Sequence, residues 1–296
     1  MKVREIMSTP VYIIGSEEPI SRARNLMLKY NISRLVVIKE KLSEEASSKS
    51  SEAIPIGIVT KADISQRLDQ AEPMWRRRPI DNIPISVIMT PDPVTIHPEA
   101  TPKQAAELLL ENKISGIPVV KSESDNNVMG IITKLDLIRY YSTLENNFGV
   151  KDIMNDFFVT VHRHHSICHV IHEMKNNDVD RVIVIDDNNK PVGIITTTNL
   201  ALHKMTNPKG GLPIKDVKMA RKNRDGGERT FRSIKEVSIV AEDVMSEPII
   251  TLDENSKAVE AAKIMVDKRI NGIPIVNNEI IGIVNAQKII AEIAEI

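Results

Sequence analysis

The sequence predicts an α+β protein built from four copies of a β-α-β-β-α repeat, each of about 60 residues. The prediction depends on three short elements that each occur four times in the same order. A short element ending in methionine begins each copy, an apolar run follows later, and a second run opens with glycine. Because recurrence of this kind marks a repeat architecture, one fold should account for all four copies.

The methionine element is followed in every copy by a segment rich in Val, Ile and Thr, which we expect to be the first strand. The four methionines are Met7, Met89, Met154 and Met245.

The second and third strands of each copy are predicted from short, β-branched and almost wholly apolar runs, a pattern typical of strands buried on both faces. The second-strand runs are Leu35–Ile38, Ile117–Val120, Val182–Ile185 and Ile273–Val276. The third-strand runs begin at Gly57, Gly130, Gly193 and Gly282.

A helix is predicted after the first strand because apolar residues recur there at helical spacing. In the second copy these are Ala105, Ala106 and Leu109. The same places hold Val170, Ile171 and Met174 in the third copy, and Ala261, Ala262 and Met265 in the fourth.

The copies are expected to be separated by two longer connectors. The expected domains are 1–69, 85–145, 146–203 and 241–296, with connectors at 70–84 and 204–240. Within the first copy, residues of about 40–53 are rich in Ser, Glu and Lys, so we expect a disordered surface loop there. The 70–84 connector contains Trp75–Arg78, and the 204–240 connector is basic.

Composition excludes several classes of function. The net charge of −1 gives no overall attraction to nucleic acid or to an anionic membrane. Aromatic residues make up only 3% of the chain, so a ligand site would have aliphatic walls. Cys168 alone cannot form an internal disulfide, and no apolar run is long enough for a signal peptide or a membrane span. We therefore expect a cytoplasmic protein.

The strand Ile114–Val120, followed by Gly130–Asp136 and a helix, resembles the CBS domain family, named for cystathionine β-synthase. A chain of four such domains resembles the gamma subunit of AMP-activated protein kinase and stand-alone archaeal CBS proteins. The resemblance implies that copies one and two pair, that copies three and four pair, and that the pairs form a pseudo-symmetric disc. It also implies regulation and energy sensing, with AMP, ADP, ATP or a related adenosine ligand in the inter-domain clefts.

Threonine stands in three copies where the third strand meets the last helix, with an acceptor three residues later. The pairs are Thr60 and Asp63, Thr133 and Asp136, and Thr196 and Asn199. Backbone N–H groups at a helix start favour an anion, and an Asp can accept two hydrogen bonds from a ribose diol. The resemblance implies that these residues contact ribose and phosphate. The same spacing is also a capping box, which would only start the helix.

Arg34 and Arg181 precede the second strand in the first and third copies, where the other copies have Gly116 and Gly272. A guanidinium matches phosphate oxygens, and the resemblance implies that these arginines reach ligand phosphate. The alternative is a solvated arginine at a strand entrance. The first copy is then the best equipped for a phosphorylated ligand. In the fourth copy Lys288 replaces the acid, so we expect that site to be empty or to hold another kind of ligand.

Five of the seven histidines cluster between His162 and His172. The candidate ligands of a transition metal are His165, Cys168, His169 and His172, which lie at helical spacing or close to it. The alternative is that these are surface positions of a helix whose apolar face lies elsewhere.

No constellation of catalytic residues is recognisable, so we expect a regulatory protein rather than an enzyme, with an adenine nucleotide as regulatory ligand and no cofactor. A protein effector is expected, although the sequence does not identify it. No membrane or nucleic-acid partner is expected. The sequence does not decide whether the chain forms a homodimer. Two other hypotheses are a scaffold or nucleic-acid-associated protein acting through the basic connector, and a metal sensor using the histidine cluster.

Overall fold

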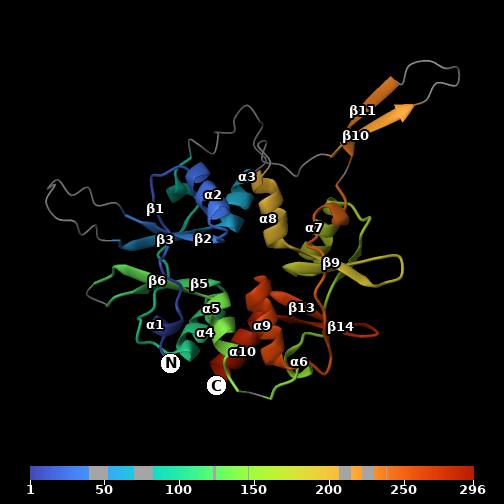
Figure 1. Ribbon diagram of the computed structural model, residues 1–296. Helices are drawn as coiled ribbons and strands as arrows, with labels where there is room; N and C mark the ends of the chain where they lie inside the picture. Colours follow the sequence, from blue (N-terminus) through green and yellow to red (C-terminus); the bar gives the residue numbers. More distant parts are fainter. Residues whose placement is uncertain are drawn as a thin grey trace. The chain divides into compact units, whose positions relative to one another are not determined.

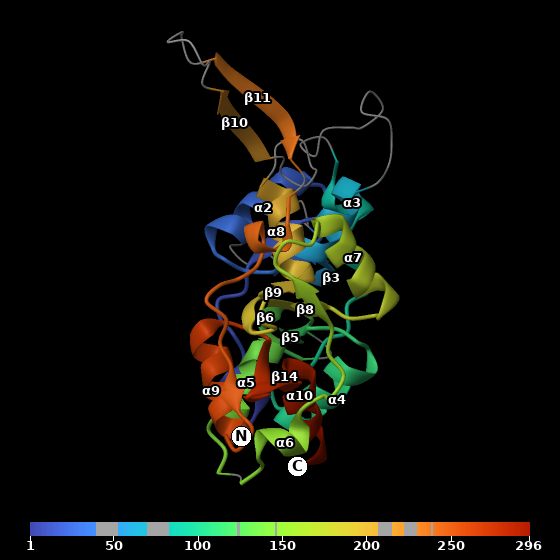
Figure 2. The ribbon, with the colours of Figure 1, turned by 90° about the vertical axis from the view of Figure 1, so that its right-hand side faces the viewer.

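A computed structural model describes residues 1–39, 53–69, 83–122, 125–145, 147–206, 215–221, 230–237 and 239–296 (Figures 1 and 2). The loop expected at 40–53 and the connector expected at 70–84 lie almost wholly outside the described residues. The chain forms two compact units. Unit 1 comprises Met1–Phe157 and Ile250–Ile296, and unit 2 comprises Phe158–Ile249.

Unit 1 contains the first two copies and most of the fourth. The first copy provides α1 (Val3–Ile6), β1 (Ile13–Gly15), α2 (Ile20–Lys29), β2 (Arg34–Ile38), β3 (Pro55–Thr60) and α3 (Lys61–Asp69). The second provides the 3₁₀ turn Ile85–Val87, β4 (Thr90–Pro91), α4 (Pro102–Glu111), β5 (Gly116–Val120), β6 (Val128–Thr133) and α5 (Lys134–Tyr141). Next come α6 (Val150–Ile153), β12 (Leu252–Asp253), α9 (Ala258–Lys268), β13 (Gly272–Asn277), β14 (Glu279–Asn285) and α10 (Ala286–Glu295).

Three sheets lie in unit 1, ordered β1-β2-β3-β4, β5-β6 and β12-β13-β14. In the first sheet β1 runs parallel to β2, and β2 runs antiparallel to β3. Helices α4, α5, α9 and α10 pack side by side (Figure 1), and their apolar faces form one core with β5, β6, β13 and β14. The predicted helix positions Ala105, Ala106 and Leu109 are buried in this core, as the helical spacing required.

Unit 2 contains the third copy. Its elements are β7 (Thr160–His162), α7 (Ile167–Asn176), β8 (Arg181–Ile185), β9 (Pro191–Thr196), α8 (Thr197–Thr206), β10 (Lys215–Arg221), β11 (Thr230–Val237) and the 3₁₀ turn Ala241–Asp243. Strand β7 runs parallel to β8, which pairs antiparallel with β9. Val170 and Met174 of α7 are buried against these strands in a separate apolar core.

The predicted α+β fold of β-α-β-β-α repeats is confirmed, although the first strands are short. In the second copy only Ile96 pairs with Val119 at that place, and in the fourth the strand has two residues. The segments after the methionines contain too few residues in extended conformation to make a longer ladder. The second and third strands, which the apolar runs predicted, form the longer part of every sheet. Burial on both faces holds for β2, β5 and β8. It is wrong for β3, β6 and β9, where buried residues alternate with half-buried ones.

Strands β10 and β11 form an antiparallel hairpin inside the segment 204–240, which was expected to be a basic connector. Their register runs from Lys215 opposite Val237 to Arg221 opposite Thr230. The connector expected here therefore includes a β-hairpin, which the sequence did not predict. An antiparallel pair is held by its own backbone ladder, so it does not need the apolar run by which the other strands were recognised.

Copies one and two exchange their leading segments, which are the short stretches with the recurring methionine and the residue after it. Ser8 pairs with Ile131 of β6, and Thr90 in β4 pairs with Ile58 of β3. A Cβ built on Gly130 would lie 2.7 Å from Sδ of Met7, and a Cβ on Gly57 would lie 2.7 Å from Sδ of Met89. Each recurring methionine therefore fills the space that the recurring glycine of the other copy leaves open.

The same exchange links copies three and four. In unit 1, Asn155 pairs with Ile283 of β14, and Met154 lies over Gly282. In unit 2, Ser246 pairs with Ile194 of β9, and Met245 lies over Gly193. The expected pairing of copy one with two and of copy three with four is therefore the pairing that the exchanged segments make.

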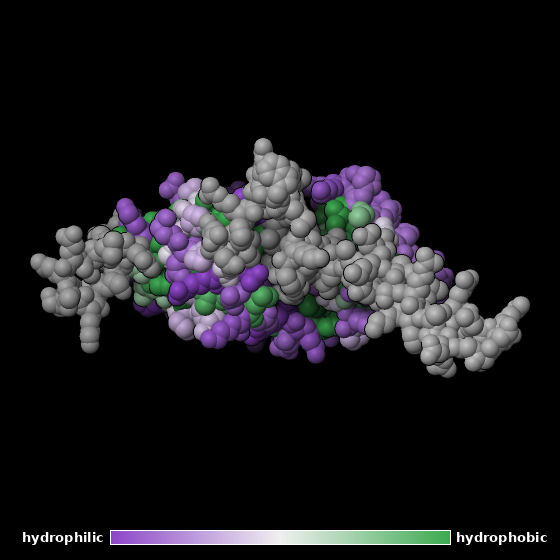
Figure 3. All heavy atoms as spheres, turned by 90° about the horizontal axis from the view of Figure 1, so that it is seen from above, coloured by the Kyte–Doolittle hydropathy of each residue, from purple (hydrophilic) through white to green (hydrophobic). Residues whose placement is uncertain are grey.

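Hydrophilic side chains dominate the coloured surface in Figure 3, and hydrophobic ones are visible there only in small areas. Among the described residues, none of the helices is both long and apolar enough to span a lipid bilayer.

The methionine–glycine contacts predict that removing the facing methionine side chain restores stability after one glycine substitution but not after another. Gly193→Ala should destabilise the protein by about 1–3 kcal/mol through overpacking. Because the two nearest atoms to the added Cβ are Sδ and Cγ of Met245, which Met245→Ala removes, most of the cost should disappear in a Met245→Ala background. Urea unfolding of the four variants of this double-mutant cycle measures the coupling.

Gly282→Ala is the matched comparison. Its added methyl group would meet the backbone oxygen of Asn155 at 2.8 Å as well as Met154. A Met154→Ala background should therefore leave most of the cost in place. Equal rescue of both glycine substitutions would contradict this account of the contacts.

Candidate functional site

The strand register brings the candidate residues of the first copy together. Arg34 at the start of β2 lies directly opposite Thr60 at the end of β3. Asp63, in the first turn of α3, accepts hydrogen bonds from the Thr60 backbone N–H and from its Oγ1, both at 2.7 Å. The Asp63 N–H donates in return to Thr60 Oγ1 at 3.3 Å. These bonds are those of a capping box, so the capping role considered from the sequence is present.

Arg34 is a half-buried cation that extends across to the second copy. A Cβ on Gly116 would collide with its guanidinium and would lie 3.1 Å from its Cδ. Burial lowers the pKa of Arg34 to about 10, and the carboxylate of Asp136 partly opposes that shift. The side chain therefore stays charged at neutral pH, yet it makes no hydrogen bond or ion pair with any residue that the structure describes.

The glycine of the second copy is explained by this contact. Gly116 occupies the same place in β5 that Arg34 occupies in β2, and it lies opposite Thr133 as Arg34 lies opposite Thr60. Two arginines could not occupy this space together. The alternation of arginine and glycine in the sequence is therefore a packing requirement of the first pair.

Asp136 differs from Asp63 in how completely its oxygens are used. Its Oδ2 accepts from the Thr133 N–H at 2.9 Å and from the Thr133 hydroxyl at 2.6 Å. Its Oδ1 accepts from the hydroxyl of Ser8 at 2.8 Å and from Arg139 at 3.0 Å. Asp136 is 1% exposed, whereas Asp63 is half-buried. The four bonds use the acceptor capacity of Asp136, which favours a structural role for it.

Oδ1 of Asp63 makes no hydrogen bond with the part of the chain that the structure describes. Lys61, the residue after Thr60, is a buried cation at the start of α3. It is 8% exposed, and burial lowers its pKa. Its amine likewise has no partner among the described residues. The first copy thus combines two partly or wholly buried cations with one carboxylate oxygen that no described residue engages.

The third copy has the same strand register, but its candidate residues already have hydrogen-bond or ion-pair partners within the protein. Arg181 lies opposite Thr196 and forms a two-pronged ion pair with Asp180, with both N–H···O distances at 2.8 Å. Asn199 accepts from Thr196 Oγ1 at 2.6 Å and donates to the hydroxyl of Ser246 at 3.0 Å. Its arginine is therefore held by an acid of its own copy.

The fourth copy starts its last helix differently. Asn285 at the end of β14 caps α10 by accepting the N–H of Lys288 at 3.0 Å. No carboxylate stands at the place of Asp63. The expectation that this copy does not hold a ribonucleotide in its own site stays a prediction.

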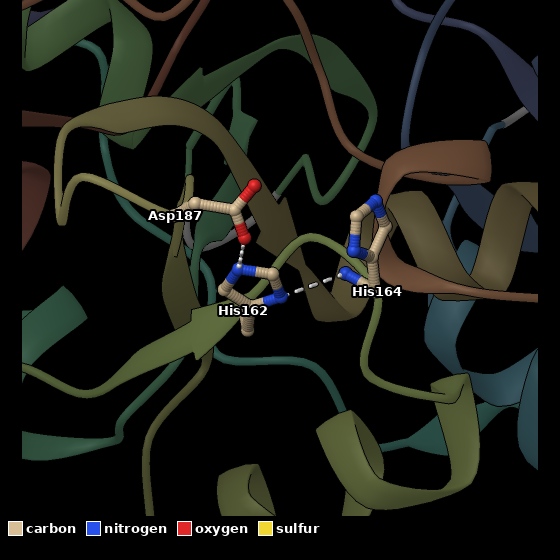
Figure 4. A group of neighbouring side chains, drawn as sticks. All are labelled: His162, His164 and Asp187. Carbon is tan, nitrogen blue, oxygen red and sulfur yellow. Dashed lines mark hydrogen bonds and ion pairs between the residues drawn. The ribbon is translucent and has the colours of Figure 1, made fainter.

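The candidate metal ligands of α7 do not come together. His165, Cys168, His169 and His172 are all exposed, and among them only the His165 and His169 rings are in contact, edge to face at 4.4 Å. Among the described residues, the group of potential ligands that does gather is His162, His164 and Asp187 (Figure 4). The surface interpretation of the α7 histidines therefore fits their positions.

Sequence reasoning missed the residue that follows each methionine. Ser8 reaches Asp136 and Ser246 reaches Asn199, each across a pair of copies. All four copies have a polar residue at this place, and the other two are Thr90 and Asn155. That recurrence was a usable signal, but only the exchange of leading segments shows which residue it reaches.

The CBS domain family model matches residues 3–69, 85–143, 150–205 and 240–295. Among curated proteins, the chain is similar to uncharacterized protein MJ1404 of Methanocaldococcus jannaschii, with 32% identity over 151 residues. That alignment covers 49% of this chain and 32% of MJ1404, so it spans about a third of the relative's length.

Two solved structures extend the comparison. MJ1225 of Methanocaldococcus jannaschii, proposed as an archaeal homologue of g-AMPK, is 20% identical with a TM-score of 0.71, and the match covers 99% of each chain. The CBS domain pair of protein MJ0100, solved with 5′-methylthioadenosine and S-adenosyl-L-methionine, is 26% identical with a TM-score of 0.38. That match covers 48% of this chain and 95% of the MJ0100 chain.

The two aspartates should differ in their effect on stability. Asp136→Ala should lower the free energy of unfolding by about 2–3 kcal/mol, because it removes the buried acceptor of hydrogen bonds from the half-buried Ser8 and Thr133. Asp63→Ala, the matched control in the first copy, should cost about 1 kcal/mol, as loss of a helix cap does. Thermal and urea unfolding check the difference, and equal losses would refute the distinction drawn between the two caps.

Proposed function

Because the chain belongs to the CBS domain family, we propose that it is a non-catalytic regulatory module that binds an adenosine nucleotide at Arg34, Thr60 and Asp63. The nucleotide would lie where β2, β3 and α3 of the first copy meet the start of β5. The proposal concerns the ligand class, its place in the chain and the way in which binding is transmitted.

The observation that carries the proposal is the state of Arg34. A half-buried guanidinium that makes no hydrogen bond or ion pair with a described residue loses part of its solvation, and the charge of Asp136 compensates only part of that loss. A phosphate group would supply this compensation through charge-assisted hydrogen bonds, which suit the planar fork of arginine. Lys61 provides a second charge at the same junction.

Asp63 supports the nucleoside part of the ligand. Its Oδ2 is engaged by Thr60, while its Oδ1 remains available to accept hydrogen bonds from a ribose diol. Capping and ligand binding are therefore compatible in this residue, because each uses a different oxygen. In Asp136 both oxygens are engaged, so the second copy's Thr133 and Asp136 are weaker candidates.

The third copy ranks between these two. Arg181 would have to exchange Asp180 for a phosphate, and the uncharged Asn199 replaces the acid. We expect Arg181, Thr196 and Asn199 to bind a nucleotide more weakly than the first site does. The fourth copy, with Asn285 and Lys288, is expected not to bind a ribonucleotide in its own site.

A signal could arise because Arg34 lies over Gly116 of the neighbouring copy. A ligand that draws the guanidinium to its phosphate changes the contact between the two copies of the pair. Binding shifts a conformational equilibrium only through such a difference between states. We propose that a protein effector, not identifiable from this chain, responds to that shift.

Calorimetric titration of the tag-free protein with AMP and with adenosine tests the site. Arg34→Gln should weaken AMP binding about 10- to 100-fold, because it removes a charge-assisted contact to phosphate. The same substitution should leave adenosine binding almost unchanged. Asp63→Asn should weaken both ligands by a similar factor, because it acts on the ribose.

Arg181→Gln is the matched control, since it removes the arginine at the same place of the third copy. It should leave the tighter of the observed binding events unchanged. The proposal fails if neither AMP, ADP, ATP nor adenosine binds, or if Arg34→Gln and Arg181→Gln affect AMP equally. Mass spectrometry of small molecules released on denaturation would identify any ligand that is retained through purification.

A further inference from the structure

A group of three donors lies in unit 2 at the end of β7. His162 is the last residue of that strand and lies opposite Ile185, the last residue of β8. Asp187 follows two residues later, and its Oδ1 is 2.9 Å from Nε2 of His162. The parallel register, rather than proximity in sequence, therefore brings the carboxylate to the histidine.

The turn after β8 gives its two aspartates different tasks. Asp186 Oδ1 accepts the backbone N–H groups of Asn188 and Lys190, both at 2.9 Å. These bonds, with that from Lys190 as the main cause, lower the pKa of Asp186. Its carboxylate is committed to holding the turn, and Asp187 is left to face His162 (Figure 4).

His164 is the third member. Its backbone N–H donates to Nδ1 of His162 at 3.3 Å, and the two rings stand edge to face with centroids 5.1 Å apart. Nε2 of His164 is 3.9 Å from Oε2 of Glu242. One potential ligand atom from each of His162, His164 and Asp187 lies within 4.8 Å of the others.

We propose that His162, His164 and Asp187 form a binding site for a divalent transition-metal ion such as Zn²⁺ or Ni²⁺. Two imidazoles with one carboxylate are donors typical of these ions, whereas Mg²⁺ and Ca²⁺ prefer oxygen ligands. The side chains of His164 and Asp187 are 61% and 79% exposed. Water can therefore complete the coordination shell.

Metal binding requires His162 to change its tautomer. Because Nδ1 of His162 accepts a hydrogen bond from His164, the ring proton is on Nε2 and faces Asp187. The ion would take that place between Nε2 and the carboxylate, and the proton would move to Nδ1. The cost is the 3.3 Å hydrogen bond from the His164 backbone, the longest of the bonds that hold this group.

A plain surface ion pair between His162 and Asp187 is the alternative. The third donor and its surroundings favour a metal. Asp186 adds negative charge nearby, while Glu242 compensates the positive charge of Arg163, at 2.7 Å. His165 does not belong to the group whose potential ligand atoms lie within 4.8 Å of one another, and its Nδ1 accepts the backbone N–H of His162 at 3.2 Å.

The test is titration of the tag-free, full-length protein with ZnCl₂ and NiCl₂ by calorimetry. We expect one equivalent of metal to bind, and Asp187→Asn and His164→Ala each to weaken binding at least about tenfold, as loss of a ligand does. His172→Ala, which removes an exposed histidine of the same segment, should leave the affinity unchanged. Circular dichroism of each metal-free variant checks that it is folded.

A second measurement separates this site from one on α7. The Co²⁺-loaded protein should show no thiolate charge-transfer band in the near ultraviolet, and a Cys168→Ala, His169→Ala double variant should bind metal as the parent does. The proposal is overturned if neither metal binds, if His172→Ala is as harmful as His164→Ala, or if binding depends on Cys168 and His169.

Discussion

The contact between a methionine of one copy and a strand glycine of its partner is the constraint on which the rest of the structure depends. It occurs four times, at Met7, Met89, Met154 and Met245. A thioether can lie this close to a strand backbone only where no Cβ stands in the way. Because each copy gives its leading segment to the other, neither copy of a pair completes its sheet with its own residues.

Fixed pairing makes the two halves of the first pair chemically unequal. Arg34 can extend over the second copy only because Gly116 has no side chain there. Equivalent positions of the two copies border this space, and a single arginine fills it. The same exchange brings Ser8 to Asp136, whereas Oδ1 of Asp63 has no hydrogen-bond partner in the described part of the chain. Identical cap sequences therefore acquire different roles from the segment that lies over them, one structural and one available to a ligand.

Much of the fold could be predicted because strands that pack into the core leave apolar runs in the sequence, even where only one face is fully buried, as in β3 and β6. The apolar runs predicted β2, β3, β5 and β6, and the helical spacing of Ala105, Ala106 and Leu109 predicted which face of α4 is buried. The hairpin β10–β11 could not be predicted in this way, because its strands are rich in charged residues. The composition of the segment predicted a connector, whereas hydrogen bonding between its two strands makes part of it a hairpin.

The sequence predicted which residues belong to the candidate site, but not which of their polar atoms are hydrogen-bonded. Spacing pointed to Arg34, Thr60 and Asp63, but the capping box and a ribose site share one sequence pattern. Only hydrogen bonding shows which oxygen of each aspartate is engaged. Asp187 was missed because 25 residues separate it from His162 and only the parallel register of β7 and β8 joins them.

The division of the chain into units has a consequence for its synthesis. Unit 1 is discontinuous, because the chain leaves it at Phe157 and returns at Ile250. Helices α4 and α5 emerge from the ribosome long before α9 and α10, which cover part of their apolar faces. Over that interval Leu109 and its neighbours lack their final cover, and exposed apolar surface of this kind is what chaperones recognise and what drives aggregation. The order of translation therefore makes unit 1 the later of the two units to become protected.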